Sequence, residues 1–175
     1  MVARASGVVV APRSGSRMAG TLSQLRQFFA TRIAATSTSG LGQGSITSPT
    51  WKQERSPFAL LDEPKARTHL AFSCQIADAI FTDAGDGSST SSRYVVEASV
   101  AVLFLYRIRA SRQADVDKAA TAAEAVARSI MTLGTEDREY MILPDLLFSP
   151  TLTDDGEALL VEQRYRVRFD STIGT

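Results

Sequence analysis

The alternation of apolar and polar positions is clearest between Arg93 and Arg109. Because successive side chains of a strand point to opposite faces, this alternation predicts one long strand. The residues of one face are all apolar: Val96, Ala98, Val100, Val102, Phe104, Tyr106 and Ile108. The other face begins with Glu97 and is apolar only in its middle. We therefore expect one face to be buried along the whole strand and the other to be half covered.

Two helices are predicted by apolar residues spaced three and four apart. Between Asp115 and Leu133 such a stripe predicts a helix that lies across the sheet, and Gly134 is suited to end it. Its members are Val116, Ala119, Ala123, Val126, Ile130 and Leu133. Nearer the start of the chain, Thr21 and Gln24 have the spacing of a capping box. They predict a helix over Leu22–Ala35, whose stripe is Leu22, Leu25, Phe29 and Ile33.

A second alternating segment, Thr68–Phe81, predicts a strand before the long one. The polar stretch Thr82–Arg93 joins the two strands, so we expect a long antiparallel hairpin with that stretch as its tip. Serine, threonine and glycine gain little from burial, and we therefore predict a tip that is mobile until the protein assembles.

The last part of the chain predicts two more strands. Tyr140–Leu152 contains Pro144 and Pro150, which have no N–H to donate, so this segment is confined to an edge strand or a loop. Asp154–Gly156 is a turn signal. It leads into Ala158–Phe169, whose apolar residues again alternate.

The predicted order is helix, long arm, strand, strand, helix, edge strand, strand. This order favours an α+β domain with a mainly antiparallel sheet, a long hairpin and helices packed on one face. We expect a single domain over residues 21–175, with a long loop or arm inserted at residues 36–67. The Arg- and Ser-rich residues 1–20 predict a disordered N-terminal arm.

The inserted arm combines two unlike compositions. Twelve of the fifteen residues of Thr36–Thr50 are Ser, Thr, Gly or Pro, so we expect this stretch to be mobile before assembly. The stretch that follows is interrupted by prolines yet carries the large apolar side chains of Trp51, Phe58, Leu60 and Leu61. Either these side chains dock on a neighbouring subunit, or Trp51 pins the loop to its own domain. We predict the first.

The composition argues against several kinds of partner. Lys+Arg and Asp+Glu both number 19, so the net charge does not draw the chain to nucleic acid. No run approaches the roughly 18 apolar residues of a membrane span. Cys74 is the only cysteine and alternates with apolar residues, so we expect a buried apolar thiol.

Catalytic and metal-binding chemistry lacks the residues that it needs. His69 is the only histidine, and its odd spacing from Cys74 on a strand directs the two to opposite faces. Zinc needs several His or Cys ligands, and no nucleophile elbow is present. Gly40–Gly44 follows a helix rather than a strand, and Asp83–Gly87 lacks the spacing of a calcium loop. We therefore expect no enzymatic activity, no catalytic residues, no metal and no cofactor.

The polar face of the last strand carries a row of three arginines, Arg164, Arg166 and Arg168, beside Glu162. A phosphate track is one interpretation, but the adjacent acid and the lack of aromatic residues on that face favour a solvated face or a salt-bridged subunit contact. We predict that the row and the arm at Trp51–Leu61 contact a neighbouring subunit. The acids that we expect opposite the arginines are Asp115, Asp117 or Glu124.

The order of elements resembles that of the tail-terminator proteins of long-tailed bacteriophages. The corresponding elements lie within Thr21–Phe169 and are Leu22–Ala35, Thr68–Arg109, Asp115–Leu133 and Ala158–Phe169. The resemblance implies a structural virion protein of the tail or neck, made in the bacterial host cytoplasm. It further implies a homo-hexameric ring that caps the tail tube protein and receives the head-tail connector or stopper protein. DNA then passes through the ring without sequence-specific contact.

Two alternatives stay open. One is a head-completion or stopper protein of the same neck. The other is a small dimeric α+β ligand-binding module, or an enzyme that works without histidine. A stable ring favours the phage functions, whereas a dimer with a closed pocket favours the module.

Overall fold

The computed structural model describes residues 20–43, 46–61, 69–83, 91–109, 112–132 and 140–174. In this part of the chain, helices lie on a five-stranded sheet, which confirms the predicted α+β class. The elements in chain order are α1 (Leu22–Ala34), β1 (Lys52–Gln53), α2 (Pro57–Leu61), β2 (Ala71–Asp83), β3 (Ser91–Arg107), α3 (Arg112–Met131), β4 (Met141–Leu152) and β5 (Ala158–Gly174).

The strands lie in the order β1–β2–β3–β5–β4. Neighbouring strands are antiparallel except for β1, which runs parallel to β2. β3 and β5 pair along their whole lengths and form the centre of the sheet. The predicted hairpin of β2 and β3 is confirmed, although β2 extends to Asp83 and β3 begins at Ser91. Residues 84–90 of its predicted tip lie outside the described residues.

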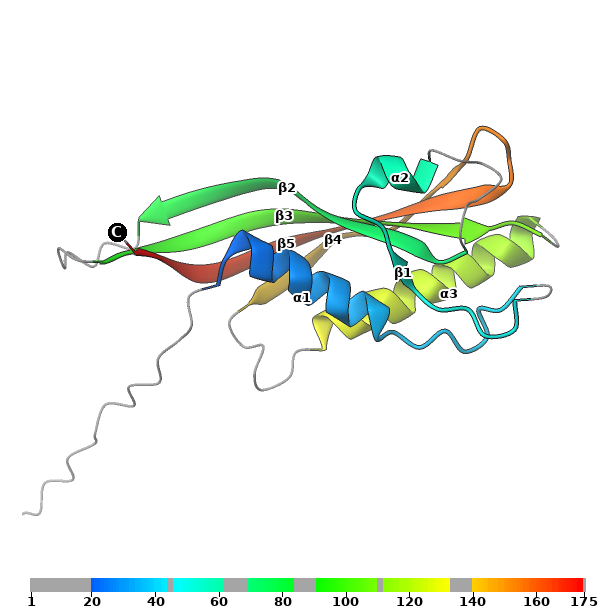
Figure 1. Ribbon diagram of the computed structural model, residues 1–175, viewed down its shortest axis with the longest axis horizontal. Coiled ribbons are helices and arrows are strands. Elements are labelled where there is room, and N and C mark those ends of the chain that lie inside the picture. Colours follow the sequence, from blue (N-terminus) through cyan, green and yellow to red (C-terminus); the bar gives the residue numbers. More distant parts are fainter. Residues whose placement is uncertain are drawn as a thin grey trace, which may run out of the picture.

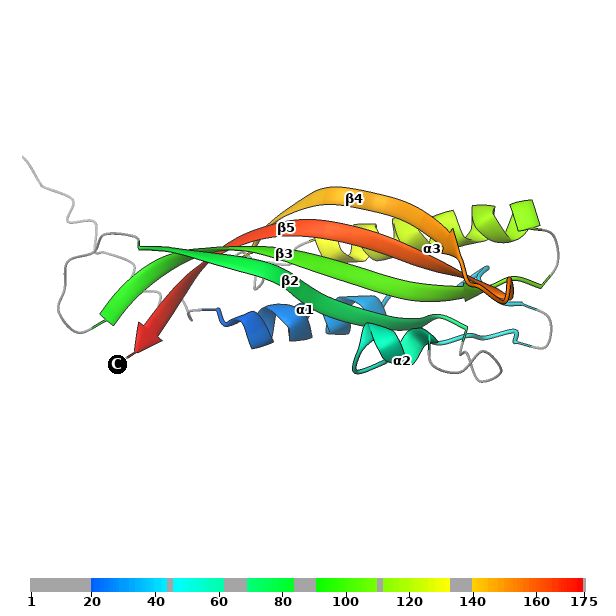
Figure 2. The ribbon, with the colours of Figure 1, turned by 90° about the horizontal axis from the view of Figure 1, so that it is seen from above.

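The helices divide between the two faces of the sheet. Figure 1 shows α1 and α3 on one face, called here the covered face, and α2 on the other, called the open face. The two predicted helices therefore share one face, and α2 is a short helix that the sequence analysis did not predict. Seen from above, α2 lies beside β2 and α3 lies beside β4, so they are near opposite edges of the sheet (Figure 2).

The covered face is apolar because every second residue of the central strands points to it. Along β5, the apolar residues Val161, Tyr165, Val167 and Phe169 are at most 3% exposed. Phe29 of α1 packs on Tyr165, with 5.4 Å between ring centroids. α3 lies close to the sheet because its buried face is built mainly from small residues. These are Ala119, Ala122, Ala123 and Ala127.

Helix boundaries follow the capping chemistry more closely than the apolar stripe. The Gln24 N–H donates to Thr21 Oγ1 over 3.2 Å, and the Thr21 N–H donates to Gln24 Oε1 over 2.8 Å. The capping box of α1 is thus confirmed. α3 begins at Arg112 rather than at Asp115. Its first residues, 112–114, are exposed, so no apolar signal marks them.

β4 is the edge strand that its prolines predicted. Pro144 and Pro150 both lie in this strand, which among the described strands pairs with β5 alone. The register shifts between Pro144 and Leu146 and again between Leu146 and Ser149. The predicted turn between β4 and β5 is also present, and Gly156 adopts a φ of 71°, which favours glycine.

The stretch between α1 and β1 is packed more firmly than its composition suggested. Thr36, Leu41 and Gln43 are buried, and Gln43 forms an isolated bridge with Ile46. The expectation that this stretch gains little from burial is therefore wrong for these residues. Gly42 is required here, because a Cβ atom would lie 2.8 Å from the Ile46 carbonyl oxygen.

The predicted N-terminal arm ends one residue earlier than expected. Gly20 is buried against Phe169, and its N–H donates to the Asp170 carbonyl over 3.2 Å. Gly20 is therefore attached to β5. Residues 1–19 lie outside the described residues, so the disordered arm stays a prediction for them.

Candidate subunit interface

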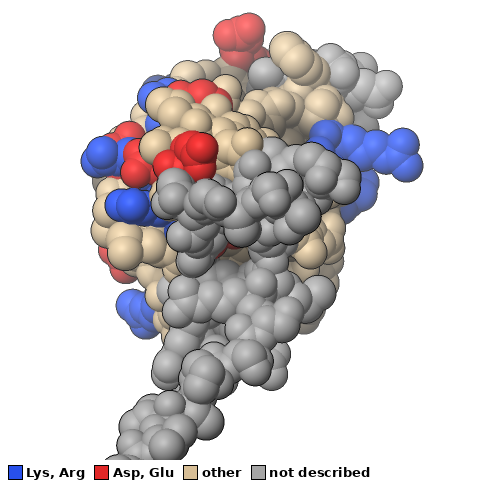
Figure 3. All heavy atoms as spheres, turned by 90° about the vertical axis from the view of Figure 1, so that its left-hand side faces the viewer, with Lys and Arg blue, Asp and Glu red and all other residues tan. Residues whose placement is uncertain are grey.

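The open face carries the arginine row of β5. Arg164, Arg166 and Arg168 have side chains that are 53%, 70% and 58% exposed. Each guanidinium already has an acidic partner in its own chain, so the row is not an unpaired positive track. The pairs and their N–O distances are Arg164–Glu162 at 2.6 Å, Arg166–Asp145 at 3.4 Å and Arg168–Glu97 at 3.9 Å. Figure 3 shows basic and acidic side chains next to one another on the surface that it presents.

One of the acids predicted to meet these arginines from a neighbouring copy is not available. Asp115 is 2% exposed, and its carboxylate accepts hydrogen bonds from Gln43 Nε2 and from the Arg109 N–H. The predicted intersubunit pair is therefore wrong for Asp115. Asp117 and Glu124 are exposed on α3, so their pairing stays a prediction.

Apolar side chains flank the ion pairs at both edges of the open face. The strand register places Ile80 of β2, Glu97 of β3, Arg168 of β5 and Met141 of β4 in one row across the sheet. Leu143 lies two residues farther along β4. Ile80, Met141 and Leu143 are 66%, 60% and 53% exposed. The exposed apolar side chains at these two edges make them candidates for a contact with another protein.

Trp51 belongs to the core of its own domain. It is 7% exposed, and its ring meets Phe72 and Phe104 edge to face, with 6.1 Å and 5.3 Å between centroids. Trp51 therefore pins the loop to its own domain, on the covered face. The predicted docking of this side chain on a neighbouring subunit is wrong. The sequence favoured a contact between subunits because Trp51 lies beside prolines and outside any periodic element.

The other predicted interface residues of the arm lie on the short helix α2 and differ in exposure. Leu60 is 2% exposed and packs with Ala71, Leu105 and Ala158 on the open face. It is thus buried in its own chain, and an exposed docking role for it is wrong. Phe58 is 74% exposed, so a docking role stays a prediction for this residue. The side chain of the fourth predicted residue, Leu61, lies outside the described residues.

A buried polar network joins the loop after α1 to the ends of β3 and α3. His69 Nε2 lies 2.9 Å from the Leu41 carbonyl oxygen, and the Arg107 N–H donates to His69 Nδ1 over 3.4 Å. These partners require the neutral imidazole with its proton on Nε2. Burial lowers the pKa of His69 below its usual value of 6.5, against a smaller opposite effect of the bond to Leu41. The network fixes the fold of the loop and leaves no histidine at the surface.

Tyr106 completes this network from β3. Its ring packs edge to face on His69, with 4.8 Å between centroids. Burial raises the pKa of Tyr106, and the neighbouring Gln43 side chain offsets part of that rise. The Tyr106 hydroxyl and Gln43 Oε1 are both buried, and neither makes a hydrogen bond of good geometry with another described residue.

Cys74 is buried, as predicted, on the covered face. Burial raises the pKa of its thiol to about 12, so the thiolate that attacks electrophiles or binds metals is scarce at neutral pH. Among the described residues, no three His, Cys, Asp or Glu side chains gather as a metal site. His69 lies in a turn before β2 rather than in the predicted strand, and its bonds engage Leu41 and Arg107 instead of Cys74.

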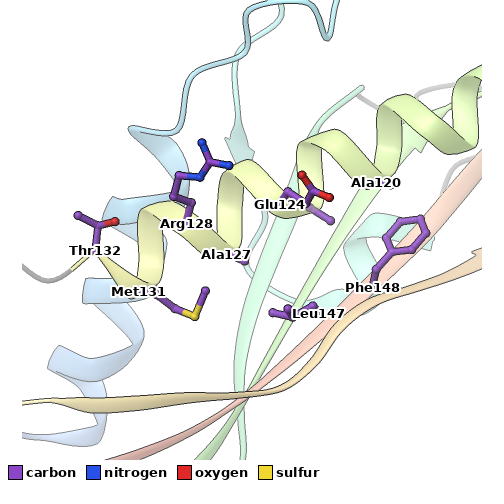
Figure 4. Close-up of a pocket in the computed structure, with 9 residues that line it drawn as sticks. Ala120, Glu124, Ala127, Arg128, Met131, Thr132, Leu147 and Phe148 are labelled. Carbon is purple, nitrogen blue, oxygen red and sulfur yellow. The ribbon is translucent and has the colours of Figure 1, made fainter.

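A groove between α3 and β4 is the surface feature that the sequence analysis missed. It has a volume of about 600 Å³. Figure 4 shows that side chains from both elements line it, among them Ala127 and Met131 of the helix and Leu147 and Phe148 of the strand. Met131 and Leu147 are 39% and 44% exposed. Their apolar positions fall outside the stripe predicted for α3 and within the proline-interrupted edge strand, so neither pattern drew attention to them.

No protein-family model matches the chain, and no curated protein matches it in sequence. In the part of the chain that the structure describes, no helix is both long and apolar enough to cross a membrane.

Proposed function

We propose that the protein is a structural virion protein, the tail terminator of a long-tailed bacteriophage. In this proposal its subunits form a homo-hexameric ring that caps the tail tube and joins it to the head connector. The ring is an assembly component without enzymatic activity or cofactor.

The observation that carries this proposal is the unequal covering of the sheet. On one face α1 and α3 bury the central strands, whereas on the other face only α2 lies over one end of them among the described elements. The uncovered part presents paired charges between the exposed apolar residues Ile80, Met141 and Leu143. A surface of this kind gains most from burial against another protein. A ring offers every copy the same neighbouring surface.

Two further observations support a structural role. The described elements keep the order on which the resemblance to tail terminators rests: a helix, a long hairpin, a second helix and a last strand. The side chains most used in catalysis, His69 and Cys74, are buried and serve the packing of the core. Both features favour assembly over chemistry.

The proposal is tested by the mass and shape of the purified full chain. We expect analytical ultracentrifugation to give a hexamer and negative-stain images to show a ring with a central hole. A chain that stays monomeric at micromolar concentration, or forms only dimers, would overturn it. The dimer would favour the ligand-binding module instead.

A binding experiment separates the terminator from the stopper. We expect the labelled protein to attach to one end of tail tubes that have been assembled from the tube protein of the same virus. Attachment to the head connector but not to the tubes would assign the protein to the head side of the neck. The variant Leu143→Arg, on the open face, should weaken the ring, whereas Gln113→Arg, on an exposed position of α3, serves as the matched control.

A further inference from the structure

An exposed aromatic side chain and an apolar groove lie on opposite sides of this molecule. Phe58 projects from α2, on the open face beside β2. The groove lies between α3 and β4, at the other edge of the sheet (Figures 2 and 4). The two features are therefore separated by the whole width of the sheet and cannot meet within one chain.

Phe58 is held outward by a well-anchored helix. Leu60, two residues away, is 2% exposed and fixes α2 against the sheet. At the start of the helix the Ala59 N–H donates to Ser56 Oγ over 3.2 Å. A ring that is 74% exposed on an anchored helix loses little conformational freedom when it binds, which is the property of an interface anchor.

The groove has the chemistry to accept such a ring. Met131, Leu147 and Phe148 give it apolar and polarisable walls, and the small side chains of Ala120 and Ala127 leave space along the helix. Methionine adapts its shape to an aromatic neighbour and makes favourable sulfur–aromatic contacts. The polar part of the lining comes from Glu124, Arg128 and Thr132 of the helix.

Charge provides a second point of complementarity. Arg55 lies three residues before Phe58 and is exposed, while Glu124 lines the groove and is exposed as well. Within the described part of the chain neither side chain forms an ion pair. A phenyl ring placed in the groove brings Arg55 to the same contact as Glu124, with Arg128 as a second basic side chain in the groove.

We propose that Phe58 of one copy inserts into the α3–β4 groove of the next copy, with Arg55 facing Glu124 across the contact. Because the projecting residue and the groove are different surfaces, the contact is head-to-tail and leaves each copy with one free end until the ring closes. The exposed Ile80 and Met141 lie at the same two edges of the sheet, in one row, and extend the contact. This inference rests on the proposed ring and identifies the surfaces that build it.

Disulfide trapping between two single variants tests the contact directly. We expect Phe58→Cys mixed with Leu147→Cys to give a covalent dimer under mild oxidation, whereas either variant alone gives none. The native Cys74 stays in place because its side chain is buried. Phe58→Cys mixed with Thr121→Cys is the matched control, since Thr121 is exposed on α3 but does not line the groove.

Carrying both cysteines on one chain measures the ring itself. The double variant should give a series of covalent oligomers, and the mass of the largest one gives the number of subunits in the ring. If the chain forms a ring but the mixture gives no covalent dimer, this inference is wrong and the proposed function stands. If Phe58→Cys cross-links to itself, the contact is two-fold rather than head-to-tail, and the inference is again wrong. A monomeric chain without cross-links overturns both proposals.

The energetic test uses Phe58→Ala, which should fold normally because the residue is exposed. We expect it to weaken assembly by about 30-fold or more, as for an aromatic hot-spot residue. Arg55→Glu should weaken assembly by roughly tenfold through repulsion of Glu124, and Glu124→Arg in the same chain should restore it. Equal assembly of Phe58→Ala and the native chain would overturn the inference.

Discussion

The covered and open faces are built from alternate residues of the same strands, yet different forces act on them. On the covered face of β5, Tyr165 and Val167 are almost fully buried under α1 and α3. On the open face the neighbouring Arg164 and Arg166 stay in contact with solvent and pair with acids of their own chain. Burial of apolar surface therefore carries most of the stability of the chain, and the exposed ion pairs of the open face contribute little to it.

The largest expected difference in stability is between variants of two aromatic residues of one segment, Trp51 on the covered face and Phe58 on the open face. Trp51→Ala removes a ring that packs on Phe72 and Phe104, so the free energy of unfolding should fall by about 3–5 kcal/mol. Phe58→Ala removes an exposed ring and should change it by less than about 0.5 kcal/mol. Urea denaturation of the two variants measures both values. Equal losses would mean that the two faces are not distinct in energy.

Removal of a buried carboxylate should have the next largest effect on stability. Asp115→Ala leaves the Gln43 amide and the Arg109 N–H without their acceptor, so the free energy of unfolding should fall by about 2–4 kcal/mol. Asp117→Ala, two residues farther along α3 and exposed, is the control and should cost less than about 0.5 kcal/mol. A small effect of Asp115→Ala would show that water replaces the lost acceptor.

A third expected effect is a loss of folding stability in acid, and it depends on the buried His69. The pKa of His69 is lowered in the folded chain, so the unfolded chain binds more protons once the pH falls below about 6.5. The stability contributed by neutral His69 is complete above that pH and is lost as the pH falls toward the folded pKa. Thermal denaturation between pH 7.5 and 5 should show this loss. His69→Gln keeps a donor for Leu41 and should flatten that part of the profile.

The smallest expected effect on stability is that of an ion pair on the open face. Arg166 and Asp145 form an exposed pair at 3.4 Å, and such pairs contribute little. A double-mutant cycle with Arg166→Ala and Asp145→Ala should give a coupling energy of about 0.2–1 kcal/mol that decreases in high salt. A coupling of several kcal/mol would show that the open face also stabilises the monomer.

The sequence predicted the elements well because their signals are local. Period-2 alternation located β2, β3 and β5, the capping box located α1, and the prolines assigned β4 to an edge. Each of these signals depends on residues within a few positions of one another. They are therefore readable without knowing what the element packs against.

The candidate site was less predictable because its surfaces depend on residues that are distant in the chain. The groove pairs Met131 of α3 with Leu147 of β4, and neither residue belongs to a periodic stripe. Phe58 was identified only as one of several apolar residues of the arm. Its exposure became evident when Leu60 proved to be buried beside Ala71 and Leu105.

Trp51 illustrates what the tertiary structure alone decided. Its place is set by Phe72 and by Phe104, which is 53 positions farther along the chain, and no local pattern reports such a contact. Leu70 is a second case, since it adopts a φ of 61°, which is rare for leucine. Its buried side chain and its N–H bond to the Leu105 carbonyl hold it there. These contacts outweigh the local cost of that backbone conformation.

By itself, the sequence determined the alternation of faces, the capping box of α1, the turn at Gly156 and the edge position of β4, because these follow from the geometry of neighbouring residues. The tertiary structure decided which apolar residues of the arm are buried, that Asp115 is an internal acceptor and that a groove borders α3. Burial is a property of the whole packed chain. It is settled only when segments far apart in sequence compete for the same face of the sheet.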